Sequence, residues 1–263
     1  RADSGRTGGS RVMKIAVSGK GGSGKTTITA VFAFLLRDMG RRVLAVDADP
    51  DANLALTLGF PDPGAIKPIS EMKNLIRERT ETDGESSGMF FKMNPRVDDV
   101  PDSLGAEHEG IRLIHLGAIR KGGGGCACPE NVFMRALLSH LILERDDAVL
   151  VDMPAGVEHL GRGTAAAVDL LLAVTEPSPQ SIQTTHRIRA LAADLKIKNV
   201  RALGNKVRDE NDRKFIAGNS PLETLGYLPF DPSLAGTGAL NPSATFVDEA
   251  RMVLYKMDGV LTK

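Results

Sequence analysis

Short runs of mostly apolar residues alternate along the chain with longer segments in which apolar residues recur at helical spacing. The short runs predict strands buried on both faces, at residues 14–18, 42–47, 111–117, 148–152, 170–175, 200–204 and 225–229. The longer segments predict helices at residues 24–40, 130–143, 179–195 and 245–257. This order predicts an α/β fold: a doubly wound, mostly parallel sheet of about seven strands with helices on both faces.

Two regions carry less regular patterns. Residues 69–79 could form a helix with Ile69, Met72, Leu75 and Ile76 on one face. Residues 84–102 predict a long loop or small hairpin, and a client-docking loop and an irregular surface explain them equally well. Residues 1–12 are polar and resemble a tag remnant or a disordered tail. We therefore expect residues 13–263 to form one domain.

Composition and charge place the chain among ordinary globular proteins. Its 263 residues include 33 basic and 33 acidic side chains, which gives a formal net charge of +0. This balance provides no general attraction to nucleic acid or to an anionic membrane, so neither is expected as a partner. No apolar run approaches the roughly 20 residues of a membrane span, and no secretory signal is visible. With only two cysteines, the expected location is the cytoplasm.

A glycine-rich segment lies between the first predicted strand and helix. Residues 18–27 (SGKGGSGKTT) satisfy the pattern G-x-x-x-x-G-K-[ST], which predicts a P-loop NTPase and makes residues 13–263 a single P-loop ATPase domain. The loop amides and the helix N-terminus suit phosphate binding. Lys25 is expected to reach the β- and γ-phosphates and Thr26 to bind Mg²⁺. The expected nucleotide contacts in this loop are Gly21, Gly22, Ser23, Gly24, Lys25, Thr26 and Thr27.

Carboxylates follow two of the predicted strands. Asp47 and Asp49 end the second strand, and Asp152 ends the run at residues 148–152. Carboxyl ends of parallel strands are where such sheets bind ligands, and an apolar run ending in Asp predicts a residue that holds Mg²⁺ through water. The alternatives are a polar turn with a helix cap at Asn53 and an ordinary aspartate at the end of a strand.

The two cysteines, Cys126 and Cys128, are separated by one residue. A disulfide between them would be strained, whereas two thiolates can chelate one soft metal ion. A tetrahedral site needs four ligands, which two copies in a two-fold dimer would supply. The spacing therefore suggests an intersubunit metal site or one completed by a client; two inert thiols are the alternative.

Several segments together resemble a known family. Lys20 gives the loop the form K-G-G-S-G-K-T-T, which resembles the deviant Walker A motif of the MinD/ParA/nitrogenase-iron-protein class of ATPases. With D-x-D-P at residues 47–50, G-G-x-C-x-C before residue 129, DMPAGVEHL at 152–160, EMK at 71–73 and NKVR at 205–208, the chain resembles the CooC-type nickel-insertion ATPases of carbon monoxide dehydrogenase maturation. Pro154 departs from the pattern, because a glycine is usual there.

The resemblance implies roles for individual residues. Lys20 would cross a nucleotide-dependent homodimer to the partner's phosphates, Asp49 would position the attacking water, and Asp47 would help hold the Mg²⁺ shell. The backbone of Gly156 would sense the γ-phosphate. At the base end of the nucleotide, the implied contacts are Asn205, Lys206 and Pro229.

The resemblance also implies an activity, an ATP-hydrolysing metallochaperone. It would bind ATP/ADP and Mg²⁺, hold Ni²⁺ (or Zn²⁺) between Cys126 and Cys128 of two chains, and insert nickel into apo carbon monoxide dehydrogenase. The alternatives are a maturation ATPase for acetyl-CoA synthase, a ParA/MinD-like positioning ATPase, and a reductase like the nitrogenase iron protein with a [4Fe–4S] cluster between subunits. That last family uses widely spaced cysteines, unlike the pair here.

Overall fold

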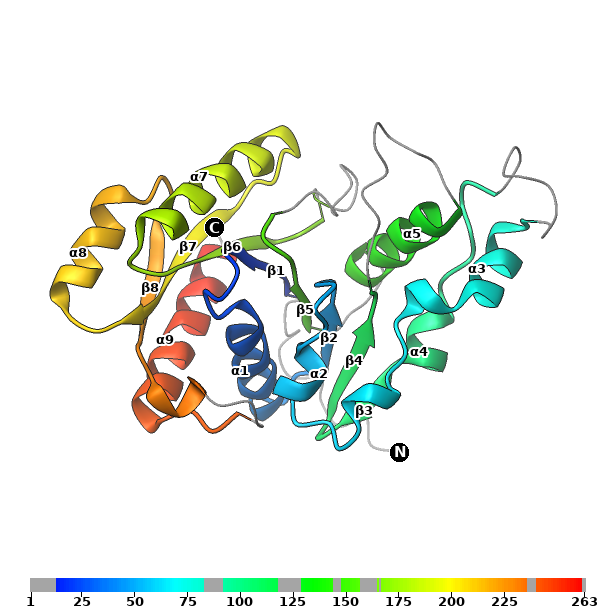
Figure 1. Cartoon of the computed structure of the whole chain (residues 1–263), viewed down its shortest axis with the longest axis horizontal. Helices are drawn as coiled ribbons and strands as arrows, with labels where there is room; N and C mark the ends of the chain where they lie inside the picture. The colour runs from blue at the N-terminus through cyan, green and yellow to red at the C-terminus, as the bar shows by residue number, and fades with distance from the viewer. Residues whose placement is uncertain are drawn as a thin grey trace, which may run out of the picture.

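The computed structural model describes residues 13–82, 92–117, 129–143, 148–156, 165, 167–235 and 240–261 (Figure 1). The predicted tail at residues 1–12 lies outside these ranges, as do Cys126 and Cys128. Among the described helices, none combines the length and the apolar character needed to cross a membrane.

In the described part of the chain, the strands form a single sheet of eight (Figure 1). All neighbouring strands are parallel except the pair β3 and β4. The strands in spatial order are β3 (Ala106–His108), β4 (Ile111–His115), β2 (Val43–Asp47), β5 (Ala148–Asp152), β1 (Lys14–Gly19), β6 (Leu170–Thr175), β7 (Val200–Val207) and β8 (Thr224–Pro229). The doubly wound, mostly parallel sheet is confirmed; β3 is the strand beyond the predicted seven.

Helices cover both faces of this sheet. Residues of α1, α2 and α9 pack into one core cluster, and residues of α3, α5 and α7 pack into the other. The described helices are α1 (Lys25–Asp38), α2 (Leu54–Thr57), α3 (Lys73–Thr80), α4 (Val100–Leu104), α5 (Pro129–Leu143), α7 (Pro179–Asp194), α8 (Glu210–Asn219) and α9 (Ala244–Leu261). Short 3₁₀ segments occupy Pro63–Ala65, Ile69–Glu71 and Pro232–Ala235.

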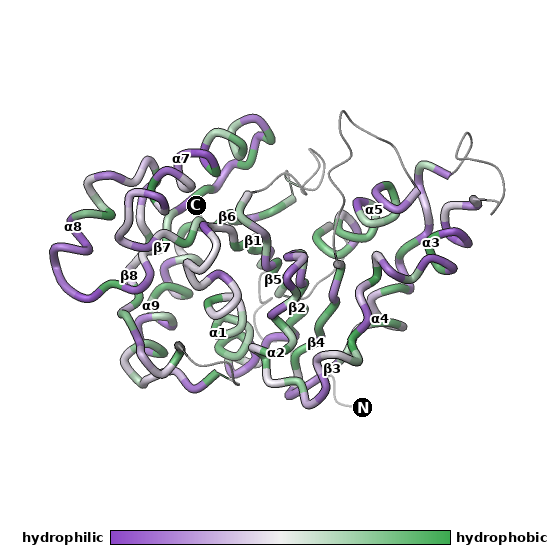
Figure 2. Tube along the Cα trace, in the orientation of Figure 1, coloured by the Kyte–Doolittle hydropathy of each residue, from purple (hydrophilic) through white to green (hydrophobic). Residues whose placement is uncertain are grey.

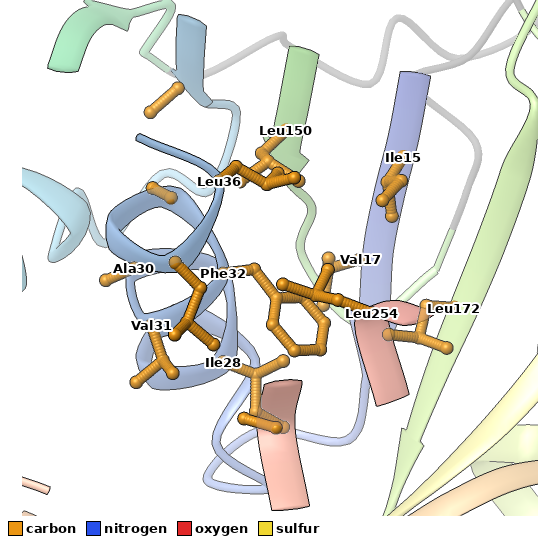
Figure 3. Packing of buried hydrophobic residues seen from close by; sticks show 14 of the residues in the cluster. Ile15, Val17, Ile28, Ala30, Val31, Phe32, Leu36, Leu150, Leu172 and Leu254 are labelled. Carbon is orange, nitrogen blue, oxygen red and sulfur yellow. The ribbon is translucent and has the colours of Figure 1, made fainter. Parts of the chain in front are cut away.

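The central strands are buried from both sides, which explains their nearly continuous apolar sequences. In β1, Ile15 and Val17 belong to the cluster formed with α1 and α9, whereas Ala16 between them belongs to the opposite cluster. Figure 3 shows Phe32 of α1 close to Val17 and Leu254. Figure 2 shows the same contrast along the chain, with apolar residues in the central strands and mainly polar ones in α8.

The single helix considered for residues 69–79 is wrong. The chain forms the 3₁₀ segment Ile69–Glu71, breaks at Met72 (φ −79°, ψ 64°), and resumes as α3. The backbone N–H of Ser70 donates to the carbonyl of Leu116 at 3.0 Å, which ties the first turn to the chain just after β4. The predicted loop at residues 84–102 lies partly outside the described ranges, and its end begins α4.

Candidate nucleotide site

The glycine-rich loop lies at the centre of the sheet. It joins β1, whose neighbours are β5 and β6, to the N-terminus of α1. Gly24 caps α1 in a left-handed conformation (φ 95°), and a Cβ at this position would collide with the side-chain amide of Asn205. Glycine is therefore required both by the backbone conformation and by the close approach of Asn205.

An open cleft of about 800 Å³ surrounds this loop. Most of the residues predicted from the sequence to bind nucleotide line it, namely Gly21, Gly22, Gly24, Lys25, Thr26, Thr27, Asp49, Asn205, Lys206 and Pro229. Ser23, Asp47 and Asp152 are buried instead, and Lys20 pairs with Glu176. The structure thus brings residues from four separate strand ends to one cleft.

The sequence did not reveal part of the cleft wall. The added residues are Pro50, Asp51, Asn53, Leu56, Thr57, Pro154, Ala155, Phe230, Asp231, Leu234 and Phe246. Most of them follow β2, β5 or β8, so adjacency to a predicted strand end was an available signal. Phe246 is different, because it belongs to α9 and nothing in the local sequence places that helix beside the cleft.

Two buried carboxylates face each other across β2 and β5. Asp47 and Asp152 are paired in the strand register. Thr26 donates its hydroxyl hydrogen to Asp152 Oδ2 at 2.6 Å. Asp152 Oδ1 is buried and has no hydrogen-bond partner within the described part of the chain. Since an unsatisfied buried carboxylate oxygen is costly, this atom is a natural ligand position.

Burial shifts the proton affinity of both acids. Loss of hydration raises the pKa of Asp152 to about 7, although the Thr26 hydrogen bond acts in the opposite direction. Burial likewise raises the pKa of Asp47 to about 6, opposed by the backbone N–H groups of Leu54 and Asp49. A divalent cation would reverse both shifts, because it favours the ionised carboxylates. The donor set of a threonine hydroxyl and buried carboxylates therefore fits Mg²⁺, which prefers oxygen ligands.

The turn after β2 is organised by Asp47. Its carboxylate accepts hydrogen bonds from the backbone N–H groups of Asp49 and Leu54, both at 3.1 Å. Asn53 lies at the cap position of α2, but its side chain makes no capping hydrogen bond. The Asn53 side chain therefore does not cap α2. The Asp47 carboxylate caps it instead, by accepting from the Leu54 N–H at the start of the helix.

Asp49 lies across the cleft from the loop lysine. Lys25 Nζ and Asp49 Oδ2 are 3.9 Å apart, and both side chains are largely buried. Asp49 is thus close to the ammonium group that is expected to meet the β- and γ-phosphates. A carboxylate at this place has the chemistry needed to orient a water molecule for phosphoryl transfer.

Two side chains near the end of β7 donate hydrogen bonds to the backbone of the glycine-rich loop. Asn205 Nδ2 donates to the carbonyl of Ser23 at 2.8 Å, and Lys206 Nζ donates to the carbonyl of Gly22 at 2.5 Å. Among the residues that the structure describes, none donates to Asn205 Oδ1, an amide oxygen of the kind that can accept from a base amino group. Near the predicted base contact Pro229, the Arg208 guanidinium stacks on the Phe230 ring, 4.4 Å from its centroid.

Ser18 connects the loop strand to the segment after β5. Its hydroxyl lies 3.0 Å from the carbonyl of Pro154 and 2.9 Å from the carbonyl of Gly156, and it accepts a hydrogen bond from the Gly156 N–H at 3.1 Å. Ser18 is fully buried. The backbone amide implied to sense the γ-phosphate is therefore held by Ser18 in this structure.

Comparison with known proteins decides the family. Residues 14–239 match the CobQ/CobB/MinD/ParA nucleotide binding domain. This chain belongs to that family. The P-loop ATPase predicted from the loop sequence is thereby confirmed, and so is the resemblance to CooC. The chain is 45% identical over 250 residues to the carbon monoxide dehydrogenase accessory protein CooC of Rhodospirillum rubrum, covering 92% of this chain and 95% of that protein.

Other relatives agree with this placement. An uncharacterised ATP-binding protein of Methanocaldococcus jannaschii is 41% identical over 254 residues, covering 95% of this chain and 98% of that protein. The fold matches the MinD cell division protein of Aquifex aeolicus with a TM-score of 0.65 at 19% identity, over 94% of this chain and 97% of that one. MinD of Pyrococcus horikoshii complexed with Mg-ADP matches with a TM-score of 0.59 at 20% identity, over 94% and 96% of the two chains.

Proposed function

We propose that this ATPase is a metallochaperone that dimerises with nucleotide and delivers Ni²⁺ to apo carbon monoxide dehydrogenase. The observation that carries the proposal is a phosphate loop whose Thr26 is hydrogen-bonded to the buried Asp152, in a chain 45% identical to CooC. The similarity extends over 92% of this chain and 95% of that protein, which supports a like activity for the chain as a whole.

Different residues of the cleft bind the phosphates, the attacking water, the base and Mg²⁺. The loop amides and Lys25 bind the phosphates, and Asp49 orients the attacking water from a position 3.9 Å from the Lys25 ammonium. Asn205, Lys206 and Pro229 line the cleft on the side where the base would bind. Bound Mg²⁺ would neutralise charge on the β- and γ-phosphate oxygens, and Thr26 with Asp152 and Asp47 would hold it.

Lys20 supplies the link between hydrolysis and dimerisation. Its ammonium pairs with Glu176 and does not line its own cleft, so it is available to the phosphates of a second copy. A cation added in trans raises phosphoryl-transfer rates by roughly 10³–10⁵. The same two-fold dimer would bring Cys126 and Cys128 of both chains together as four thiolates for nickel, or for zinc in its place.

Nickel titration with and without ATP tests the metal site. We expect about one Ni²⁺ per dimer, bound more tightly with ATP, and loss of stoichiometric binding in Cys126→Ala/Cys128→Ala. His186→Ala is the matched control, because His186 is an exposed potential ligand on α7 and should not affect the stoichiometry. Equal nickel affinity with ATP and with ADP would contradict the coupling, because a ligand shifts only states that it distinguishes.

Client assays test the second half of the proposal. Nickel-loaded protein with ATP should activate apo carbon monoxide dehydrogenase, and the double cysteine variant should not. Activation of apo acetyl-CoA synthase in its place would favour the related maturation ATPase. Sedimentation with DNA or liposomes, without activation of either enzyme, would favour a positioning ATPase.

A further inference from the structure

Three neighbouring strands deliver charged residues to one place beside the phosphate loop. The sheet order at this point is β1, β6, β7. Gly19 pairs in register with Val174, and Thr175 pairs with Gly204. Lys20 and Glu176 therefore directly follow β1 and β6, and Lys206 lies near the end of β7, so that the acid has a lysine on each side.

The contacts within this cluster are close. Lys20 Nζ donates to Glu176 Oε1 at 2.9 Å, and Lys206 Nζ lies 3.5 Å from Glu176 Oε2. The turn that carries Glu176 is fixed by the Ser181 hydroxyl, which accepts from the Glu176 N–H at 3.0 Å. The Glu176 side chain is only 15% exposed, whereas Lys20 is 37% exposed. The acid is thus the fixed member of the pair, and Lys20 is the member that can leave.

The electrostatics agree with a charged cluster. Burial alone would raise the pKa of Glu176, but the hydrogen bond from Lys20 and the charges of the two lysines outweigh it. The pKa therefore lies below its usual value. Glu176 is thus ionised at neutral pH.

Lys206 has a second attachment that Lys20 lacks. Its Nζ also binds the carbonyl of Gly22, and its backbone adopts a left-handed conformation (φ 59°) at an irregularity between β7 and β8. A non-glycine residue held in this region is strained, and such strain is concentrated at functional sites. Lys206 is therefore held beside Glu176 by contacts that do not involve Lys20.

We propose that Glu176 is a positioning residue for Lys20: it holds Lys20 away from the second subunit in the separate chain and releases it when the nucleotide-bound dimer closes. Lys206 then keeps the carboxylate paired, so that release does not leave a buried charge without a partner. This inference rests on the proposed role of Lys20 in trans. It adds that Glu176 of the same chain and the phosphates bound by the other chain compete for the Lys20 ammonium.

Glu176→Gln tests the competition, because glutamine keeps the shape and removes the charge. The measurement is ATPase activity per chain as a function of protein concentration at saturating Mg-ATP, with dimer mass followed by light scattering. Half-maximal activity and dimerisation should shift to about threefold to tenfold lower protein concentration, as expected for loss of two partly exposed ion pairs per dimer. Only the protein concentration at half-maximal activity should change. The turnover rate at saturating protein should stay the same.

Glu81→Gln is the matched control. Glu81 forms an exposed pair with Lys92 at the same 2.9 Å distance, away from the loop, and its removal should not shift the concentration dependence. Mg-ADP affinity and the melting temperature of Glu176→Gln show whether the fold and the nucleotide site are intact.

The outcomes separate this inference from the function on which it rests. If Lys20→Ala hydrolyses ATP at the normal rate, the role of Lys20 in trans fails. If Lys20→Ala is inactive but Glu176→Gln has unchanged or weakened dimerisation, only the present inference fails. Support requires that the Glu176→Gln shift in dimerisation disappears in the Lys20→Ala background, since a merely structural role of Glu176 would persist there.

Discussion

Burial of Asp152 disfavours its ionised form, whereas binding of a cation would require that form. Asp152 ends an apolar strand, is fully buried, and has a pKa raised to about 7 by the loss of hydration. Its free oxygen and its bond to Thr26 nevertheless suit a cation site. The metal-free protein therefore tolerates a destabilising acid at the position where we propose that magnesium binds.

This conflict predicts an unusual dependence of stability on pH. The pKa rises from 3.8 to about 7 on folding, so ionisation costs nothing below pH 3.8 and its full penalty applies above pH 7. Metal-free stability should fall between these limits, by up to about 4 kcal/mol from this group. Asp152→Asn should therefore unfold at a higher temperature than wild type at pH 8, with the difference vanishing near pH 4.

Magnesium and nucleotide should reverse that order. Mg-ADP should raise the melting temperature of wild type and hardly affect Asp152→Asn, whose Mg-dependent ATPase activity should fall by about 10²–10³. Asp51→Asn changes an exposed acid of the same cleft and should alter neither the pH dependence nor the response to Mg-ADP. An Asp152→Asn protein that is less stable than wild type at pH 8 without metal would argue against a burial penalty.

At the scale of residues, the sequence predicts those members of the cleft that belong to a local motif or follow a predicted strand. Most of the predicted loop residues, with Asp49, Asn205 and Pro229, line the cleft, because loop pattern and strand ends place them there. The Lys20–Glu176 pair was not predictable, because its members are far apart in sequence and meet only through the order of β1 and β6. The roles assigned to these residues, and to Cys126 and Cys128, stay predictions.

At the scale of elements, one side chain makes several hydrogen bonds to the segment after β5. The Ser18 hydroxyl reaches backbone groups of Pro154 and Gly156. We expect Ser18→Ala to cost about 1 kcal/mol. It should also speed amide hydrogen exchange at Gly156, because the Gly156 N–H loses its acceptor.

A second serine separates local release from general destabilisation. Ser103, in α4, donates its hydroxyl hydrogen to the carbonyl of Asp99 at 2.8 Å, so Ser103→Ala removes a serine hydrogen bond at an exposed position of another element. Exchange at Gly156 should remain at the wild-type rate in this control. Unchanged exchange there in Ser18→Ala would show that other contacts hold the segment.

Two of the elements that the sequence missed, β3 and α8, bury few residues. The strand β3 has three residues, none fully buried, so it carries no apolar run. The helix α8 buries only Ile216 among its residues and is instead started by Asp209, whose side chain accepts from the N–H groups of Asn211 and Asp212. Apolar periodicity detects helices that fill a core, and α8 is stabilised mainly at its end.

At the scale of the whole molecule, the central question is whether one chain contains a complete active site. Lys20 points to Glu176 and not into its own cleft, whereas Asp49 lies within it. If the site is shared, a complete site needs Asp49 from one chain and Lys20 from the other. Two variants that are each inactive should then restore activity when they are mixed.

We therefore predict complementation between Lys20→Ala and Asp49→Asn. In a mixed dimer, the cleft of the Lys20→Ala chain has its own Asp49 and receives Lys20 from the partner, whereas the second cleft lacks both groups. An equal mixture forms about half mixed dimers with one working site each, so about a quarter of wild-type activity should return. Steady-state ATPase assays with Mg-ATP, above the dimerisation concentration, measure it.

The control mixture combines Lys20→Ala with the double variant Lys20→Ala/Asp49→Asn. No chain in it carries Lys20, so a shared site requires that it stay inactive, although nucleotide binding and dimer mass should resemble those of the first mixture. If Lys20 acted within its own chain, both mixtures would be equally inactive, because every chain would lack one of the two groups. The difference between the mixtures thus decides whether hydrolysis is a property of the chain or of the dimer.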